Sequence, residues 1–272
     1  MNGVGPRTLI RGGGDLATGV AYRLHQAGFA VVVAETEQPL AVRRLVALAE
    51  AIYAGSVEIE GLRGVRVFDE GEIQAALKAG EVPVIVDPEA GLLSSGHWIA
   101  LIDGRMRKRP PELPLSSAPM VIGLGPGFTA GKDCHAVVET NRGHRMGRVY
   151  WEGSAEADTG VPEAVLGYDV DRVLRAPAEG VLMSHVALGK QVHRGETIAT
   201  VDGHEVTAAF DGVLRGLIHD GLPVHEAMKI GDLDPRRNPS YCTQISDKSL
   251  AVGGGVLEAM LSSPKIRRQL AA

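Results

Sequence analysis

The sequence predicts an α/β protein that contains an open, mostly parallel sheet, an all-β module and a C-terminal helical segment. In the first half of the chain, strand-length apolar runs alternate with helical patterns. A glycine-rich turn follows the first of these runs, and short β segments repeat at a spacing of 32 residues after residue 175. We therefore expect domains at 1–170, 171–236 and 237–272.

The composition is that of a globular protein with one large or two smaller domains. The chain has 272 residues, of which 44% are hydrophobic and 4% aromatic, and the 35 glycines favour short elements. The formal net charge is -5, and acidic and basic residues are mixed along the sequence. The sequence therefore shows no basic region of the kind that binds nucleic acid. No apolar run is long enough to cross a bilayer. Residues 1–7 lack the apolar core of a secretory signal, and Cys134 and Cys242 are compatible with reduced thiols, so we expect a cytoplasmic protein.

The first glycine loop organises the predicted sheet. The apolar run Thr8–Ile10 leads into Gly12–Gly14, and a helical pattern follows from Asp15 to Ala27. The loop fits the G-x-G-x-x-G/A fingerprint of Rossmann-like domains, in which small residues let the backbone approach a pyrophosphate at a helix N-terminus. Two interpretations stay open: a nucleotide-like ligand at this loop, or a tight turn whose glycines serve packing.

Two acidic residues bear on this choice. Asp15 follows the glycines directly, where its carboxylate could cap the helix and compete with phosphate for the same N–H groups. Glu35 ends the apolar run 29–34 and lies 23 positions after Gly12, close to where an acidic residue would hold a ribose hydroxyl. Asp15 therefore argues against pyrophosphate, whereas Glu35 argues for a dinucleotide.

The following segments continue the α/β pattern. We expect a helix from Pro39 to about Ala54, with Leu40, Leu45, Leu48 and Ile52 on its buried side. Arg43 and Arg44 on this helix would form either a solvated face or an anion-contacting pair. Strands are expected at 65–68, 82–87 and 98–103, with a helix at 70–78, and the proline-rich, basic range 105–119 is expected to run over the surface.

A second glycine loop follows this connector. The apolar run Met120–Ile122 leads into Gly123, Gly125 and Gly127. Because open α/β sheets bind ligands at the carboxyl ends of their strands, the two loops predict a site between them. The alternative is a glycine-rich hairpin without a ligand.

Further along, Cys134, His135 and His144 bring metal-ligand and nucleophile chemistry into one region. A structural zinc site needs four ligands at recognised spacings, so we assign no metal. Adjacent residues of a strand point to opposite faces, which disfavours activation of Cys134 by His135. Arg142, His144 and Arg145 could instead contact an anionic ligand, or this region could be a polar surface turn.

A 32-residue repeat defines the second domain. Gly180–Leu182 aligns with Gly212–Leu214, and Val192-His193 aligns with Val224-His225. A β hairpin repeated about a pseudo-twofold axis resembles the barrel-sandwich hybrid of lipoyl and biotinyl domains. The tip between the halves, at 202–205, has no lysine to modify, so we expect an unmodified docking module.

The C-terminal segment 237–272 has a helical pattern with an apolar stripe. Ser246 or Asp247 can cap a first helix, and Val256 and Met260 lie on the stripe of the second. Such a stripe must be buried, so we expect this segment to pack on the first domain or on a second subunit.

Together, these segments resemble the YqeB-like accessory proteins of the selenium-dependent molybdenum hydroxylase system. The resemblance covers nearly the whole chain and rests on Arg11–Gly19, Gly123–Phe128, Glu139–His144, Gly212–Leu217, Lys229–Arg236 and Ile245–Lys248. It implies a role in making or inserting a molybdenum hydroxylase cofactor, with no established catalytic residues to carry over.

The leading hypothesis is therefore a maturation factor that binds a nucleotide or pterin-phosphate ligand, such as a molybdopterin-type nucleotide, and docks on a molybdenum hydroxylase. An NAD(P)-dependent oxidoreductase and a non-catalytic scaffold are the alternatives. No catalytic residue is assigned, and homo-oligomerisation stays open. The predicted ligand-binding residues are Gly12, Gly13, Gly14, Asp15, Leu16, Glu35, Gly123, Gly125, Gly127 and Arg142.

Overall fold

The computed structural model describes residues 5–109, 111–158, 160 and 164–271. Residues 1–4, on which the expected cytoplasmic location partly rests, lie outside this set. The chain forms two compact units. Unit 1 comprises Met1–Pro39, Leu48–Asp158 and Ile245–Ala272, and unit 2 comprises Leu40–Ala47 and Thr159–Gln244.

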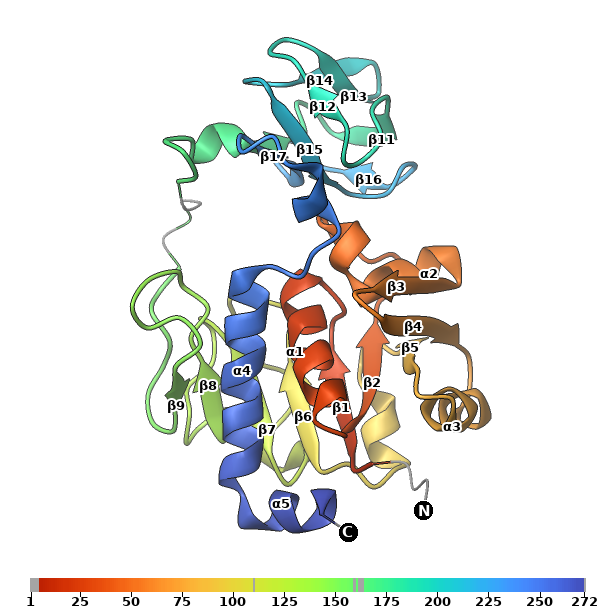
Figure 1. Ribbon diagram of the computed structural model, residues 1–272, viewed down its shortest axis with the longest axis vertical. Helices are drawn as coiled ribbons and strands as arrows, with labels where there is room; N and C mark the ends of the chain where they lie inside the picture. Colours follow the sequence, from red (N-terminus) through yellow and green to blue (C-terminus); the bar gives the residue numbers. More distant parts are fainter. Residues whose placement is uncertain (1–4, 110, 159, 161–163, 272) are drawn as a thin grey trace. The chain divides into compact units, whose positions relative to one another are not determined.

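Unit 1 is built on a nine-stranded sheet with the order β3-β4-β5-β2-β1-β6-β7-β8-β9 (Figure 1). Neighbours from β4 to β8 pair in parallel, whereas the edge strands β3 and β9 pair antiparallel. The sheet is therefore mixed but mostly parallel. The strands are β1 (Arg7–Arg11), β2 (Ala30–Glu35), β3 (Ser56–Ile59), β4 (Leu62–Val67), β5 (Val82–Val86), β6 (Ala100–Asp103), β7 (Val121–Leu124), β8 (Ala136–Val138) and β9 (Val149–Tyr150).

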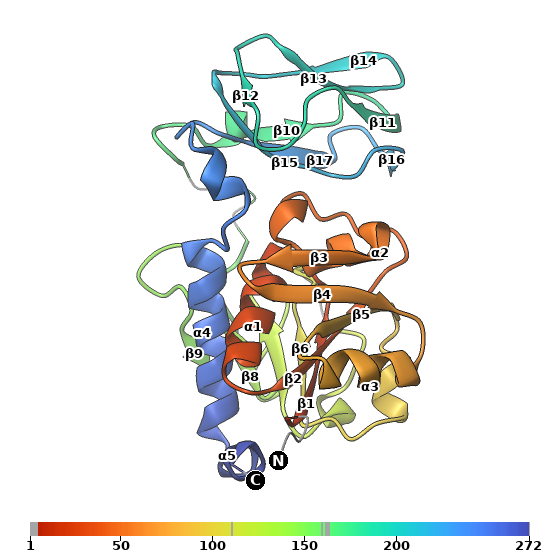
Figure 2. The ribbon, with the colours of Figure 1, turned by 45° about the vertical axis from the view of Figure 1, so that its right-hand side comes forward.

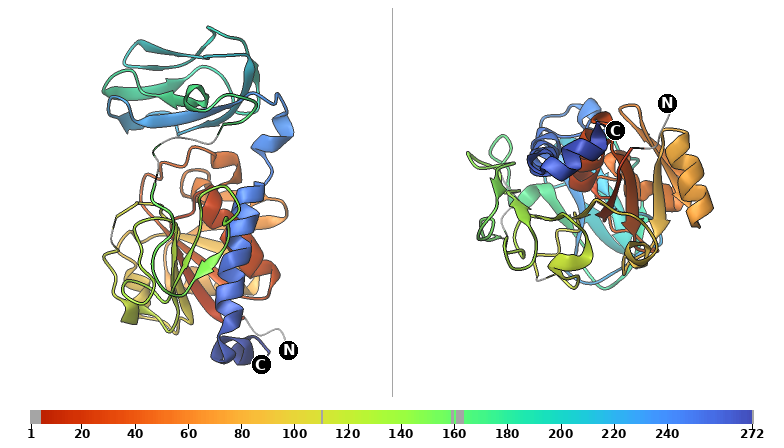
Figure 3. Two further views of the ribbon diagram at one scale, coloured as in Figure 1. Left: turned by 90° about the vertical axis from the view of Figure 1, so that its left-hand side faces the viewer. Right: turned by 90° about the horizontal axis from the view of Figure 1, so that it is seen from below.

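Both faces of this sheet are covered, as alternation along β1 illustrates. Ile10 packs into a core that includes residues of α1 (Asp15–Gln26), α2 (Ala51–Ala54), α4 (Asp247–Ser262) and α5 (Pro264–Leu270). Leu9 points to the opposite core, which includes α3 (Glu70–Lys78). Figure 2 shows α1 and α4 side by side, and Figure 3 shows α4 and α5 from two further directions.

Glycines set the contact between α1 and α4. A Cβ added at Gly19 would lie 2.4 Å from the carbonyl oxygen of Ser249, and one added at Gly253 would lie 2.4 Å from the carbonyl oxygen of Gly19. These small residues let the two helix backbones approach closely. Ser246 caps α4, because its side chain accepts a hydrogen bond from the Ser249 N–H.

The predicted helix over 39–54 is wrong. This range contains short 3₁₀ turns at Arg44–Val46 and Leu48–Glu50 before α2. Residues 40–47 belong to unit 2, where Arg44 Nε donates to the Leu217 carbonyl at 2.9 Å. Leu40, expected on the buried side, is 52% exposed. The apolar spacing that suggested one helix is thus divided between two units.

Unit 2 contains two four-stranded antiparallel sheets, with the orders β10-β17-β15-β12 and β14-β13-β11-β16. The 32-residue repeat explains the two strand orders. The strands β11, β12 and β13 begin 32 residues before β15, β16 and β17. When each of these strands is exchanged for its counterpart, and β10 for β14, one strand order becomes the other. The strands are β10 (Val173–Arg175), β11 (Gly180–Ser184), β12 (Gln191–Val192), β13 (Thr197–Val201), β14 (His204–Thr207), β15 (Gly212–Leu217), β16 (Pro223–Val224) and β17 (Lys229–Asp234).

Candidate functional site

The strand order of unit 1 reverses between β1 and β6. From β1 the chain first adds β2 on one side, and only later adds β6 on the other. Such a switch point is where open α/β sheets bind ligands, outside the carboxyl ends of the strands. Here these ends carry Arg11, followed by the first glycine loop, and Asp103, followed by Gly104 and Arg105.

The first glycine loop is held by its neighbours on both sides. Gly12 has a φ of 87°, and its N–H donates to the Ala34 carbonyl at 2.8 Å. The Gly13 N–H donates to Glu35 Oε1 at 2.6 Å, and the Gly13 carbonyl accepts from the Ala49 N–H at 2.9 Å. The Gly13 N–H is therefore already used in a hydrogen bond within the protein.

Glu35 links this loop to the end of β2. Its second oxygen, Oε2, accepts from the Thr36 N–H at 2.8 Å. Burial raises the pKa of Glu35 above its usual value, although the hydrogen bonds from Gly13 and Thr36 and the charge of Arg105 act in the opposite direction. A carboxylate at this place can also accept a hydrogen bond from a ligand hydroxyl group.

Gly14, rather than Asp15, is the N-cap of α1. The expectation that Asp15 caps the helix is therefore wrong, because Asp15 is already the first helical residue. Gly14 has φ -65° and ψ 177°, a conformation open to any residue, and a Cβ added there would meet no atom within 4 Å. The first N–H groups of a helix have no acceptor within the helix. Space beside Gly14 is thus available next to hydrogen-bond donors.

A charged cluster lies at the ends of β1 and β6. Arg105 donates from Nε and Nη2 to the two oxygens of Asp103, at 3.0 and 2.6 Å, and from Nη2 to Glu112 Oε2 at 2.7 Å. Arg11 Nη1 lies 3.8 Å from Asp103 Oδ2 and 3.4 Å from Glu112 Oε2, and its Nη2 donates to the Pro88 carbonyl at 2.7 Å. Arg11 and Asp103 are buried. The hydrogen bond from Arg105 lowers the pKa of Glu112.

The connector after β6 contacts both glycine loops. A Cβ added at Gly12 would lie 3.1 Å from Arg105 Cγ, one at Gly125 would lie 3.1 Å from Met106 Cε, and one at Gly127 would lie 2.7 Å from the Arg109 nitrogen. The two loops therefore lie on one side of the molecule with the chain 105–109 packed against them.

The glycines of the second loop serve packing in this structure. Gly123 lies beneath the Phe128 ring, since an added Cβ would be 2.3 Å from Phe128 Cγ. An added Cβ at Gly125 would also lie 2.4 Å from Thr140 Oγ1. The sequence predicts a ligand between the two loops. At Gly123, Gly125 and Gly127, however, protein atoms lie where a side chain or a ligand atom would have to be.

Arg142 pairs with the C-terminal helix. Its Nη1 and Nη2 donate to the two oxygens of Asp247, in the first turn of α4, at 2.5 and 2.6 Å. Three residues before Arg142, the buried Glu139 carboxylate accepts hydrogen bonds from the backbone N–H groups of Thr140, Asn141 and Glu156 at 2.7–2.8 Å. Arg142 thus pairs with α4 in this structure, whereas the sequence left open contact with an anionic ligand or a polar surface turn.

Of Cys134, His135 and His144, the first two take structural positions. Cys134 is 0% exposed, and burial raises its pKa to about 11. His135 Nδ1 accepts from the Val121 N–H at 2.9 Å, and burial lowers its pKa. His144 is exposed. Within the described ranges, no three His, Cys, Asp or Glu side chains gather in a way that could hold a metal ion.

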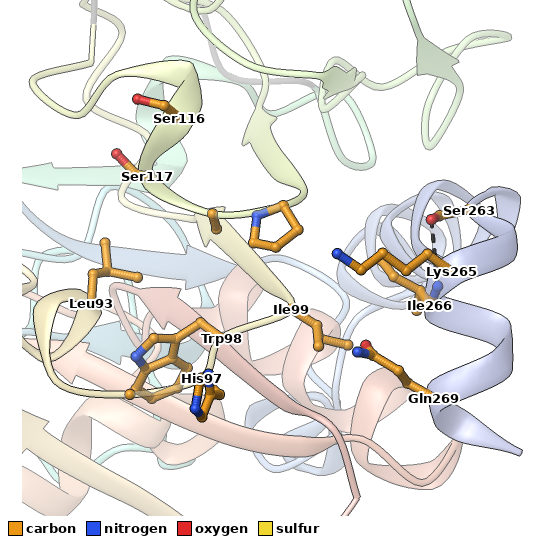
Figure 4. Close-up of a pocket in the computed structure, with 13 residues that line it drawn as sticks. Leu93, His97, Trp98, Ile99, Ser116, Ser117, Ser263, Lys265, Ile266 and Gln269 are labelled. Atoms are coloured by element: carbon orange, nitrogen blue, oxygen red, sulfur yellow. Dashed lines mark hydrogen bonds between the residues drawn. The ribbon is translucent and has the colours of Figure 1, made fainter. Parts of the chain in front are cut away.

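A pocket of about 510 Å³ lies at the other end of the sheet, by the amino ends of β6 and β7 (Figure 4). Trp98 and Ile99 lie just before β6, Ser117 precedes β7, and Lys265 and Gln269 come from α5. We favour the switch point over this pocket as the functional site, because parallel α/β sheets carry their ligands at the carboxyl ends of the strands.

Sequence reasoning missed the cluster formed by Arg11, Asp103, Arg105 and Glu112. A usable signal was present, because Arg11 and Asp103 are charged residues that directly follow the apolar pairs Leu9-Ile10 and Leu101-Ile102 at the ends of their strands. Charges at the carboxyl ends of buried parallel strands point toward the ligand-binding edge.

Unit 1 is thus an α/β unit with a candidate ligand site at the switch point of a mostly parallel sheet. The chain is a homologue of the uncharacterized protein YqeB of Escherichia coli (strain K12), with 45% identity over 253 residues, which is 93% of this chain and 47% of that protein. It therefore spans about half the length of this curated relative. No protein-family model matches the chain.

Two solved structures show a distant likeness to the chain. An aspartoacylase family protein from Mesorhizobium loti aligns at 10% identity and TM-score 0.27, over 84% of this chain and 85% of the other. A succinylglutamate desuccinylase/aspartoacylase from Rhodobacter sphaeroides aligns at 15% identity and TM-score 0.26, with the same coverage of both chains. Similarity at this level supports no functional assignment. Among the described residues, no helix combines the length and apolar character needed to span a membrane.

Proposed function

We propose that unit 1 binds a nucleotide-like or pterin-phosphate ligand at the first glycine loop. The observation that carries this proposal is the open space beside Gly14, at the N-terminus of α1 and at the switch point of the sheet. A helix N-terminus offers N–H donors and a favourable dipole to a phosphate. A hydroxyl group of the same ligand would share the oxygens of Glu35, which already accept from Gly13 and Thr36.

We further propose that the protein is an accessory factor in the maturation of a selenium-dependent molybdenum hydroxylase. This part rests on the resemblance of the six segments to YqeB-like proteins and on the homology to YqeB. Molybdenum cofactors are pterin phosphates or dinucleotides, which suits a phosphate site in a Rossmann-like domain. The repeated β module of unit 2, which resembles an unmodified barrel-sandwich hybrid, would then dock on the hydroxylase.

An NAD(P)-dependent oxidoreductase is the second candidate, and the position of Glu35 at the end of β2 favours it. Because Glu35 already accepts from Gly13 and Thr36, a ribose hydroxyl would have to share its oxygens. Substrate-dependent change in NAD(P)H absorbance would identify this activity.

Mass spectrometry of small molecules released from the purified chain tests the proposal. We expect a phosphate-containing pterin or nucleotide from the natural sequence and none from Gly14→Val, whose side chain would fill the open space. The same ligand recovered from Gly14→Val would place it elsewhere. If the chain captures a hydroxylase but neither carries nor binds such a ligand, the scaffold alternative would be favoured.

A further inference from the structure

Four arginines surround a single carboxylate beside the glycine loops. Glu112 Oε2 accepts from Arg105 Nη2 at 2.7 Å and from Arg11 Nη1 at 3.4 Å. Glu112 Oε1 accepts from Arg107 Nη1 and lies 3.7 Å from Arg109 Nη2. Despite these partners, the Glu112 side chain is 42% exposed. It therefore lies at the solvent side of a group of guanidinium donors.

The cluster has more positive than negative groups. Asp103 is the second carboxylate in contact with these arginines. The positive charge of Arg105 also acts on Glu35, where it favours the ionised carboxylate. Four guanidinium groups thus contact two carboxylates, Glu112 and Asp103, whereas Glu35 is influenced by Arg105 only through its charge. Guanidinium groups bind carboxylate and phosphate through the same paired N–H donors. A site that holds the Glu112 carboxylate therefore also suits a phosphate.

We propose that Arg11, Arg105 and Arg107 form a binding site for a phosphate group, and that Glu112 occupies this site as an internal competitor in the free protein. The proposal deepens the function proposed above and rests on it for the identity of the whole ligand. Because Arg105 packs on Gly12, the phosphate site adjoins the first glycine loop.

The exposed fractions of Arg11, Arg107 and Glu112 are consistent with replacement of the Glu112 carboxylate by a phosphate. The Arg11 side chain is 3% exposed and is held by the Pro88 carbonyl, so it is oriented before a ligand arrives. Arg107 is 33% exposed and Glu112 is 42% exposed. An incoming phosphate could therefore replace Glu112 from the solvent side while the sheet and its core stay intact. If Glu112 served only to tether the connector, its removal would not improve phosphate binding.

Calorimetric titration of the full chain with pyrophosphate separates these roles. We expect Glu112→Gln to bind pyrophosphate about tenfold or more tightly than the natural sequence, since it loses the competing charge. Glu81→Gln is the matched control, because Glu81 pairs with Arg63 Nε at 3.0 Å and its replacement changes the net charge equally. Equal or weaker binding by Glu112→Gln, or an equal gain in Glu81→Gln, would overturn the proposal.

Arg107→Gln provides a second test that does not depend on the folding of Glu112→Gln. Arg107 is on the exposed side of the cluster, so its replacement should weaken pyrophosphate binding severalfold without lowering the thermal midpoint. Undiminished binding would contradict the assignment of Arg107.

ADP binding by Gly14→Val separates failure of this inference from failure of the proposed function. If Gly14→Val binds ADP normally while Glu112→Gln gains affinity for pyrophosphate, the phosphate site stands and the ligand position beside Gly14 is wrong. If Gly14→Val loses ADP and Glu112→Gln gains nothing, only the phosphate site is wrong.

Discussion

The N–H of Gly13 donates to Glu35 Oε1 at 2.6 Å, which joins the first glycine loop to the end of the neighbouring strand β2. In a dinucleotide fingerprint, the acidic residue at this position binds a ribose hydroxyl group. In this protein, Glu35 at that position holds the first glycine loop in place. Glu35 therefore has a structural role in the free protein as well as the proposed contact with a ligand.

Replacement of Glu35 should change how stability depends on pH. Because its pKa is raised in the folded chain, the folded state binds more protons than the unfolded state above the ordinary glutamate pKa of about 4.3. The free energy of unfolding therefore decreases as pH rises through this window, until the folded-state pKa is passed. Glu35→Gln removes this decrease.

Urea unfolding between pH 4 and about pH 7 checks this prediction. Gln can accept only one of the two backbone hydrogen bonds, so Glu35→Gln should be less stable than the natural sequence at the acidic end. The deficit should shrink as pH rises. A difference that stays constant across the range would show that Glu35 titrates normally.

Adjacent glycines of the first loop should respond differently to substitution. A Cβ at Gly13 would lie 2.8 Å from the Ala49 nitrogen, so Gly13→Ala should cost about 1–3 kcal/mol of unfolding free energy. Gly14→Ala meets no atom within 4 Å and should change stability by less than about 1 kcal/mol. Urea unfolding at neutral pH measures both, and equal losses would contradict the loop geometry.

A second pair of adjacent glycines tests the contact between α1 and α4. A Cβ at Gly253 would lie 2.4 Å from the Gly19 carbonyl oxygen, whereas one at Gly254 meets nothing within 4 Å. Gly253→Ala should destabilise the protein by about 1–3 kcal/mol. Gly254→Ala should stabilise it by about 0.5–1 kcal/mol, because alanine favours the helix. Thermal unfolding of both variants checks the prediction, and a stable Gly253→Ala would exclude close packing of these helices.

The two cysteines should be unreactive in the folded protein. Cys134 and Cys242 are 0% and 2% exposed, and burial raises the pKa of Cys134 to about 11. At pH 8 the thiolate fraction of Cys134 is then about one in a thousand. A chromogenic disulfide reagent should therefore modify both thiols only after denaturation. Rapid modification of Cys134 in the native chain would revive its interpretation as a nucleophile.

Local sequence patterns predicted the elements whose contacts are close along the chain or regular in spacing. The range 70–78 was predicted as a helix and is α3, whose N-cap Asp69 accepts from the Glu72 N–H. The 32-residue repeat anticipated the matching strands of unit 2 because each repeat supplies equivalent strands to the two sheets.

Long-range contacts explain what the sequence did not predict. Residues 40–47 have helical apolar spacing, yet Arg43 donates to the carbonyls of Tyr241 and Gln244, which lie 198 and 201 positions further along the chain. Arg43 and Arg44 therefore bind backbone carbonyls, which neither sequence interpretation anticipated. Similarly, only the fold brings Arg11, Asp103 and Glu112 together, because β6 is placed beside β1.

Calorimetric titration with ADP tests the central claim, a phosphate-bearing ligand at the N-terminus of α1. We expect saturable binding to the natural sequence, and at least about tenfold weaker binding to Gly14→Val. The thermal midpoint of Gly14→Val should fall by no more than a few degrees, because valine is a poorer N-cap than glycine. Gly254→Ala, a glycine replacement elsewhere in unit 1, should bind ADP normally. Equal ADP affinity in the natural sequence and Gly14→Val, or no binding to the natural sequence, would contradict the account.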